Sequence, residues 1–182
     1  MILAVDVHYE DFAANTACVG FLTWSDAEST LELVQRCESP PEPYEPGQFY
    51  KRELPHLQLV IESVRRSMDV DAVIIDGHVW LNENHPGLGA HLYHALGGGI
   101  AVVGVAKSEF RDATAIPVCR GQSRQPLFVT AVCIDASQAA ELVRSMDGPH
   151  RIPTLLKRAD QLARRTEEPD GAKAILSASS GR

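Results

Sequence analysis

The chain has 182 residues, which predicts a single domain large enough to bury a sizeable core. Its 24 acidic residues outnumber 17 basic ones, and a net charge of -7 argues against a protein that coats nucleic acid through bulk positive charge, although it does not exclude a nuclease that meets phosphate through bound metal. No apolar run approaches the roughly 20 residues needed to span a bilayer, so we expect no membrane contact.

The first third of the sequence predicts an antiparallel meander of three strands. Residues 2–8 (ILAVDVH) are apolar and carry one acid, residues 16–24 are rich in β-branched and aromatic side chains, and residues 29–37 alternate apolar and polar positions. Short turns between these segments favour antiparallel pairing. Residues 38–47 then contain four prolines and a glycine, which predicts a stiff loop.

The middle of the sequence predicts parallel strands joined by helices. After the proline-rich loop we expect a helix with Pro55 in its first turn, where the missing N–H costs nothing. The apolar face of this helix is formed by residues at helical spacing: Leu57, Ile61, Val64 and Met68. Residues 71–76 (DAVIID) and 100–106 (IAVVGVA) predict buried strands with a short helix over residues 87–96 between them, so parallel pairing is expected.

The next part of the sequence is less regular. Residues 107–125 are polar and give no clear assignment, whereas residues 126–134 (PLFVTAVCI) predict a further strand. Asp135 or Ser137 is expected to cap a helix that runs to Met146.

The C-terminal part predicts a last helix and a tail. The helix is expected over residues 153–165, and the small and polar residues 166–182 predict a disordered segment. We therefore expect one α/β domain over residues 1–165, with three antiparallel strands, then parallel strands, and helices on both faces of a mixed sheet.

Four acids are placed so that they could gather at one spot. Asp6 lies on the first strand, Asp76 ends the fourth, Glu53 stands at the entrance of the helix between them, and Asp160 lies on the last helix. Carboxylates gathered on a sheet raise one another's pKa and need a cation to stay ionised together. Mg²⁺ or Mn²⁺ takes such oxygen ligands, and the chemistry it serves is phosphodiester hydrolysis. The alternative is that each acid is a solvated surface charge, although Asp6 and Asp76 adjoin apolar strands where an unpaired acid is costly.

Six sequence blocks together match one known pattern. They are AVDVHY at 4–9, PYEPGQFYKRE at 43–53, IIDGH at 74–78, HP at 85–86, GVAKS at 104–108 and RIPTLLKRAD at 151–160. In their order and spacing these blocks resemble the endonuclease V family, the deoxyinosine 3′ endonucleases, over nearly the whole chain to about residue 165. The most specific block is Tyr44-x-Pro46-Gly47, followed six residues after the glycine by Glu53.

This resemblance implies a ribonuclease H-like fold and a Mg²⁺- or Mn²⁺-dependent endonuclease. Such an enzyme recognises inosine from deaminated adenine in DNA or RNA and cuts the second phosphodiester 3′ to it, in DNA repair or RNA processing. Carried over by position, the resemblance implies Asp6, Glu53 and Asp76 as metal-binding acids, Asp160 as a fourth acid and Lys107 as a residue near the scissile phosphate.

The resemblance also implies residues that contact nucleic acid. Tyr44 falls in the family's wedge loop, where an aromatic on a loop stiffened by residues such as Pro46 fills the gap left by a flipped base. Gly47 and Gly77 let backbone approach that base, and His85 matches a histidine beside the site.

Plainer interpretations of these residues stay open. Tyr44 could be an ordinary exposed aromatic, Lys107 a solvated lysine at a strand end, and His85 a turn cap. His91 and His94 stand three residues apart and could share a helix face, but zinc requires three or four fixed nitrogen or sulfur ligands. We therefore expect these histidines to be surface or packing residues.

The sequence departs from the family pattern around the substrate. The family's Asp-Gly-x-Gly ends here in Val79, its His-Pro-Arg ends in Gly87, and its Ser-Pro-Gly-His ends in Cys133. The acids persist while parts of the recognition shell change, and Val79 is expected to narrow or reshape the base pocket. Two alternative functions follow: a related nuclease of altered specificity, or a catalytically weak nucleic-acid-binding protein of the same fold.

The cysteines and the N-terminus bear on the compartment. Cysteines 18, 37, 119 and 133 are widely spaced and form no C-x-x-C pair, so we expect buried, reduced thiols and a cytoplasmic protein. The first residues, MILAVD, lack the basic start and long apolar run of a signal peptide. We expect a monomer whose partner is DNA or RNA.

Overall fold

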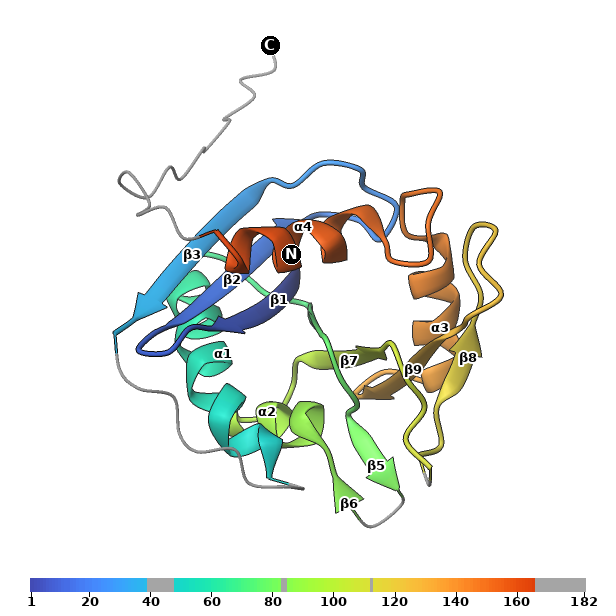
Figure 1. Cartoon of the computed structure of the whole chain (residues 1–182), viewed down its shortest axis with the longest axis horizontal. Coiled ribbons are helices and arrows are strands. Elements are labelled where there is room, and N and C mark those ends of the chain that lie inside the picture. Colours follow the sequence, from blue (N-terminus) through green and yellow to red (C-terminus); the bar gives the residue numbers. More distant parts are fainter. Residues whose placement is uncertain (39–47, 83–84, 112, 166–182) are drawn as a thin grey trace.

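The computed structural model describes residues 1–38, 48–82, 85–111 and 113–165. The strands there are β1 (Ile2–Tyr9), β2 (Ala14–Phe21), β3 (Leu31–Cys37), β4 (Ala72–Ile75), β5 (Trp80–Asn82), β6 (His85–Pro86), β7 (Ala101–Ala106), β8 (Ile116–Val118) and β9 (Leu127–Val132). The helices are α1 (Phe49–Arg65), α2 (Leu88–Ala95), α3 (Ala136–Ser145) and α4 (Thr154–Ala163). Within these ranges a seven-stranded sheet has the order β3-β2-β1-β4-β7-β9-β8, and β5 and β6 form a separate hairpin (Figure 1).

The sheet combines the predicted meander with the predicted parallel strands. β1 pairs with β2 and β2 with β3 in antiparallel fashion, while β1 pairs with β4 and β4 with β7 in parallel. β9 runs antiparallel to both β7 and β8. Parallel strands need a long crossover, usually a helix, whereas the segment between β7 and β9 contains β8 instead, so these last strands form an antiparallel edge.

The first helix starts earlier than the sequence predicts. α1 begins at Phe49, so Pro55 lies inside the helix and not in its first turn. A proline in a helix interior removes one backbone hydrogen bond and is costly by itself. Tertiary contacts offset that cost, because the Tyr9 hydroxyl at the end of β1 donates to the carbonyl of Arg52 at 2.9 Å. The additional N-terminal turns of α1 are thereby held against the sheet.

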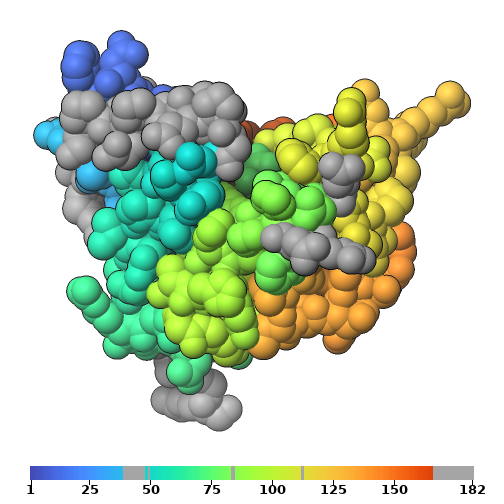
Figure 2. All heavy atoms as spheres, turned by 90° about the horizontal axis from the view of Figure 1, so that it is seen from below, coloured from blue at the N-terminus to red at the C-terminus, as the bar shows by residue number. Residues whose placement is uncertain are grey.

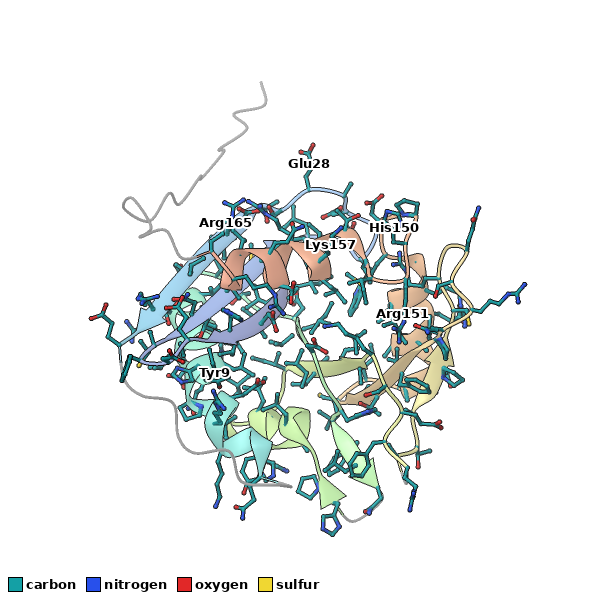
Figure 3. The ribbon with its side chains drawn as sticks, viewed as in Figure 1. Tyr9, Glu28, His150, Arg151, Lys157 and Arg165 are labelled. Atoms are coloured by element: carbon teal, nitrogen blue, oxygen red, sulfur yellow. The ribbon has the colours of Figure 1, made fainter. Side chains whose placement is uncertain are left out.

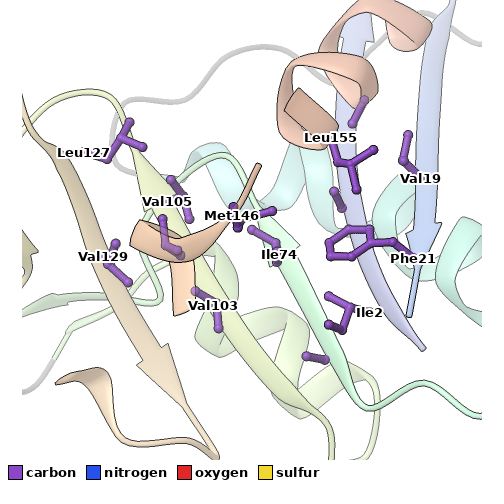
Figure 4. Close-up of a cluster of buried hydrophobic side chains, with 14 of the residues drawn as sticks. Ile2, Val19, Phe21, Ile74, Val103, Val105, Leu127, Val129, Met146 and Leu155 are labelled. Carbon is purple, nitrogen blue, oxygen red and sulfur yellow. The ribbon is translucent and has the colours of Figure 1, made fainter. Parts of the chain in front are cut away.

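Two apolar layers lie on opposite faces of the sheet because side chains alternate along each strand. Ile2 and Ala4 of β1 face one layer, together with side chains of α3 and α4, and Figure 4 shows this cluster around Phe21 and Ile74. The neighbouring β1 residue Leu3 belongs to the other layer, which α1 and α2 cover. Helices therefore pack on both faces, as predicted.

Polar contacts fix α3 and α4 at defined places. Asp135 caps α3 by accepting a hydrogen bond from the Gln138 N–H at 3.0 Å, so of the two predicted caps the structure uses Asp135. On α4, Arg158 donates to both carboxylate oxygens of Glu32 on β3, at 2.7 and 2.6 Å. Such bidentate pairs are geometrically specific, so this pair sets the position of α4 across the meander.

A buried arginine holds the connection between α3 and α4. Arg120 is 5% exposed, and its guanidinium donates to the carbonyls of Arg144 at 3.4 Å, Asp147 at 3.2 Å and His150 at 3.1 Å. These carbonyls belong to the last turn of α3 and to the loop that follows it. The Arg120 guanidinium therefore provides hydrogen bonds to carbonyl oxygens at the end of α3 and in the following loop, where no helix or strand pairs them.

The segment after β4 crosses closely over β7. Gly104 faces the backbone of this segment, and a Cβ added there would lie 2.5 Å from the carbonyl oxygen of Gly77. The Thr130 hydroxyl accepts the Val79 N–H at 2.7 Å. The Val79 side chain is fully buried in the layer under α1 and α2. Val79 therefore adds a side chain to the core, and its expected effect on a base pocket stays a prediction.

The buried-thiol prediction holds for one cysteine and is wrong for two. Cys18 is buried, Cys37 is half-buried, and Cys119 and Cys133 are exposed. Cys133 follows the last residue of β9 and adopts a φ of +63°, which directs the chain into a turn. Each cysteine in the described ranges is a free thiol.

One edge of the seven-stranded sheet ends in a short strand. The edge strand β8 has three residues, and the central one is Pro117, which pairs with Phe128 of β9.

Figure 2 shows the face that carries α1 and α2, with the blue residues near the β1–β2 turn projecting from it. Among the described residues no helix combines the length and apolarity required to cross a membrane.

Candidate active site

Strand register brings two of the predicted acids side by side. β1 and β4 run parallel with Val5 next to Ile75, so Asp6 and Asp76 occupy the next pair of positions. Both follow residues of the layer that faces α3 and α4, Ala4 and Ile74, by two positions. Since side chains alternate along a strand, both carboxylates extend from the same face at the carboxyl end of the central strands.

Glu53 reaches this edge from α1. Its neighbour Arg52 lies over the Tyr9 ring, with the guanidinium carbon 3.8 Å from the ring centroid, and also accepts the Tyr9 hydroxyl through its carbonyl. His56, one turn later, meets the same ring edge-on at 5.9 Å. These contacts join the second turn of α1 to the end of β1, which keeps Glu53 near Asp6.

The acids act on one another electrostatically. Burial, followed by the charges of Asp76 and Asp160, raises the pKa of Asp6 to about 7. Burial, followed by the charges of Asp6 and Asp76, raises the pKa of Glu53 to about 8. Because like charges in a partly desolvated place disfavour ionisation, these shifts indicate that the four acids form one cluster.

Two cationic groups adjoin the acids. The Lys107 ammonium nitrogen lies 2.5 Å from Asp76 Oδ2, and although burial opposes it, the hydrogen bond and charge of Asp76 raise the lysine pKa. Arg164, which follows the last residue of α4, donates to Asp160 Oδ1 at 3.0 Å, and this hydrogen bond lowers the pKa of Asp160. Lys107 and Arg164 therefore neutralise part of the negative charge of the four acids, and the charge that remains can attract a further cation.

The donor set fits a hard divalent cation. Within the described ranges no group of three or more His, Cys, Asp or Glu side chains is arranged so that it could hold a metal ion as it stands. Mg²⁺, however, keeps several waters and requires only one or two direct carboxylates. Asp6, Glu53 and Asp76 can supply oxygen ligands. Burial and mutual repulsion disfavour the ionised forms of Asp6 and Glu53, and a bound divalent cation would offset that repulsion.

The raised pKa values predict that the metal-free protein loses stability as pH rises from about 4 to 8. In the unfolded chain both acids ionise near pH 4, whereas in the folded chain Asp6 and Glu53 keep their protons to about 7 and 8. The folded state then binds more protons in this window, so its free energy of unfolding falls with pH. Since both side chains are partly solvated, we expect a loss of about 2 kcal/mol, less than the full shifts imply, in thermal unfolding with EDTA.

Glu53→Gln should flatten this pH slope, whereas Glu62→Gln on the same helix should leave it unchanged. Saturating Mg²⁺ should raise Tm more at pH 8 than at pH 5, because it binds the ionised carboxylates. A slope that persists in full in Glu53→Gln would contradict the assignment.

The structure describes some of the predicted nucleic-acid contacts. Gly77 follows Asp76 directly and has a φ of +149°, a conformation that glycine adopts far more readily than other residues. His85 is exposed in β6, and among the described residues it makes no hydrogen bond, ion pair or ring contact with the acids. The remaining three residues, Tyr44, Pro46 and Gly47, lie outside the described ranges.

Histidines elsewhere pack against aromatic rings. His91 stacks on Tyr50 with 3.6 Å between ring centroids, and His94 contacts Tyr93 edge-on. His78 Nε2 lies 3.2 Å from the Ser108 carbonyl and links the loops that follow Asp76 and Lys107. This link could not be predicted from the sequence, because it joins two polar loops that are 30 residues apart.

A cavity of about 290 Å³ opens directly beside the acids. Its lining includes Asp6, Asp76, Lys107 and Asp160, together with Arg151 and Lys157. Sequence reasoning missed the two basic residues, although both belong to the block from which Asp160 was identified. Their charge alone does not distinguish them from solvated surface residues.

Comparison with known proteins shows which family this chain matches. The family model described as endonuclease V matches residues 1–129. A search of curated proteins by sequence gave no significant match.

Solved structures agree in fold. The catalytic domain of human endonuclease V has a TM-score of 0.74 and 21% identity, covering 90% of this chain and 80% of that one. Endonuclease V from Streptomyces avermitilis has a TM-score of 0.67 and 25% identity, with 90% and 79% covered. Endonuclease V from Ciona intestinalis, in complex with DNA containing an inosine followed by a ribo-adenosine, has a TM-score of 0.73 and 17% identity, with 90% and 83% covered. The predicted ribonuclease H-like fold is confirmed.

Proposed function

This chain belongs to the endonuclease V family, and from that premise we propose that it is a divalent-metal-dependent endonuclease that hydrolyses the second phosphodiester 3′ to inosine in DNA or RNA. The observation that carries this proposal is the cluster of Asp6, Glu53, Asp76 and Asp160 with Lys107 at the carboxyl edge of the central strands. The inosine-containing DNA held by the Ciona relative supports inosine as the recognised base.

The acids divide into ligands and a supporting group. Asp6, Glu53 and Asp76 would hold Mg²⁺ or Mn²⁺, and Asp160 adds charge from α4. A divalent cation bound there supplies activation of water and neutralisation of charge on the leaving oxygen. Glu53, whose pKa burial raises to about 8 in the metal-free protein, would have to lose its proton to serve as a ligand.

Lys107 has a separate role at the phosphate. Its ammonium group is held 2.5 Å from Asp76 Oδ2, so it remains at the edge where the scissile phosphate would lie. From there it can donate to a non-bridging phosphate oxygen as a point charge. Gly77, beside Asp76, leaves backbone open to a nearby base.

A cleavage assay tests the proposal directly. Labelled strands that carry one inosine, and matched strands with adenosine, are incubated with Mg²⁺ or with EDTA, as DNA and as RNA. We expect one product that ends one nucleotide beyond inosine, formed only with Mg²⁺. Cleavage of inosine and adenosine strands at equal rates would indicate a nuclease of altered specificity, and no cleavage with either Mg²⁺ or Mn²⁺ would overturn the proposal.

Tyr44→Ala is expected to weaken binding to inosine in a duplex more than to inosine in a single strand. The duplex must unstack a base and leave a gap, and an aromatic side chain filling it is worth roughly 1–3 kcal/mol by analogy with base stacking on protein aromatics. Tyr44→Phe keeps the ring and serves as the control. Equal losses on both substrates, measured by fluorescence anisotropy, would indicate a general contact and not a wedge.

A further inference from the structure

The cavity beside the acids exists because two helices leave the centre of one sheet face uncovered. α4 packs mainly on β1 and β2, whereas α3 packs on β8 and β9 (Figure 1). The central strands β4 and β7 lie between these helices, and Ile74 and Val105 from them form the floor of the cavity. Leu127, Ile152 and Leu156 form its apolar walls.

The lining of the cavity carries charges of both signs. Asp6, Asp76 and Asp160 contribute carboxylates, and Arg151 and Lys157 contribute cationic groups from the loop before α4 and from α4 (Figure 3). An apolar interior with a few fixed polar groups is the usual composition of a ligand site, and about 290 Å³ is near the lower end of the usual range of volumes.

Arg151 contributes a fixed positive charge to the lining of the cavity. Its terminal Nη2 donates to the carbonyls of Lys107 and Pro126, the latter at 2.7 Å, so the guanidinium is fixed in place. Its Nε is buried and has no hydrogen-bond partner among the described residues. The Nε is enclosed by protein atoms, whereas the fixed guanidinium as a whole brings a positive charge to the lining of the cavity.

We propose that this cavity is a second nucleobase site, which takes the base of the nucleotide on the 3′ side of the cleaved phosphodiester. The inference rests on the proposed function. A nucleobase is flat and apolar on its faces, as the interior of the cavity requires, and it is linked to phosphates that Lys107, Arg151 and Lys157 attract. Because Asp6, Asp76 and Asp160 line both the cavity and the candidate site, one nucleotide can occupy both.

The proposed inosine contact and the cavity lie on opposite faces of the sheet, which sets the direction in which a bound nucleic-acid strand crosses the acids. Val79, two residues after Gly77, packs under α1 and α2, so the proposed contact of Gly77 with inosine lies on that side. The cavity lies on the opposite face, among residues that pack against α3 and α4. A nucleic-acid strand that passes from inosine across the acids therefore places the nucleotides 3′ to the cut in the cavity. A base held there cannot pair, so the nucleotide after the cut must be unpaired in the bound state.

A binding experiment on the wild-type protein tests this inference. An inosine-containing single strand is compared with the same strand in which the nucleotide 3′ to the expected cut is abasic. Anisotropy is measured with Ca²⁺ in place of Mg²⁺, and the strand is checked afterwards for cleavage. We expect about tenfold weaker binding of the abasic strand, and no loss when the abasic site is moved three nucleotides further 3′. Equal binding of the two strands overturns the inference.

Filling the cavity provides the second arm. Leu156→Trp places a ring inside the cavity, whereas Leu59→Trp makes the same change on an exposed position of α1, 58% exposed, on the other face of the sheet. Leu156→Trp should bind the normal strand as weakly as the abasic one, with no further loss on the abasic strand, and Leu59→Trp should match wild type. Emission from 2-aminopurine at the same nucleotide should change on binding to wild type but not to Leu156→Trp.

The results separate this inference from the proposed function. Preferential cleavage at inosine without an abasic effect leaves the function intact and overturns the base site. An abasic effect without a preference for inosine supports the base site and overturns inosine recognition. If Leu156→Trp does not fold, which circular dichroism reports, the two wild-type comparisons still decide.

Discussion

Asp6→Asn is expected to reduce cleavage by at least about a thousandfold without lowering the stability of the metal-free protein. A metal ion contributes several kcal/mol of transition-state stabilisation, and each 1.36 kcal/mol corresponds to tenfold in rate. Asp6 is disfavoured as an anion by burial and by the charges of Asp76 and Asp160. Removing its charge therefore relieves repulsion in the metal-free state, and Tm at pH 8 should stay equal or rise slightly.

Single-turnover cleavage at saturating Mg²⁺ and thermal unfolding in EDTA measure the two effects. Asp69→Asn is the matched control, since Asp69 is exposed and lies before β4, at the opposite end of the sheet. Near wild-type turnover in Asp6→Asn would show that this carboxylate is not a ligand. A large drop in Tm would show instead that it supports the fold.

Gly104→Ala is expected to lower the free energy of unfolding by about 2–3 kcal/mol and to reduce cleavage sharply. The added methyl carbon would lie 2.5 Å from the Gly77 carbonyl oxygen, 2.8 Å from Thr130 Oγ1 and 2.9 Å from the Val79 nitrogen. Two of these atoms are backbone, so the crossing segment must move. That segment begins directly after Asp76, and the carboxylate moves with it.

Gly99→Ala separates this steric effect from the loss of glycine itself. Gly99 has a φ of +82° and no atom within 4 Å of an added Cβ, so its replacement costs only backbone strain, about 1–2 kcal/mol. Gly99→Ala should keep the wild-type cleavage rate at a temperature where both proteins are folded. Wild-type activity in folded Gly104→Ala would show that the close crossing does not position Asp76.

The strongest local patterns in the sequence predicted the fold correctly. Apolar runs such as residues 71–76 and 100–106 have few alternatives to a buried strand, and Asp135 before an amphipathic stretch marks a helix start. The start of α1 was misplaced because Pro55 is a local signal, whereas the Tyr9 contact that holds the earlier turn joins residues 43 positions apart. β8, with three residues and a proline, is too short to give a periodic pattern.

The candidate site shows the same division between local and distant information. Asp6 and Asp76 could be singled out from single strands because each acid interrupts an apolar environment. Arg120 and Arg151 could not, because their meaning comes from carbonyls of segments distant in the sequence. Val79 shows a third case. The effect of a changed residue in a motif depends on where its side chain points, and the side chain of Val79 points into the core.

The form of β8 has a consequence for self-association. An exposed strand edge invites a second chain to add to the sheet, and such pairing is a common route to aggregation. β8 is three residues long and Pro117 is at its centre, so it offers at most two backbone N–H groups to an incoming strand. Proline at an edge is one of the devices by which sheets stop growing. At this side the sheet is therefore terminated by its own sequence, and strand addition by a neighbouring copy is disfavoured even at high protein concentration.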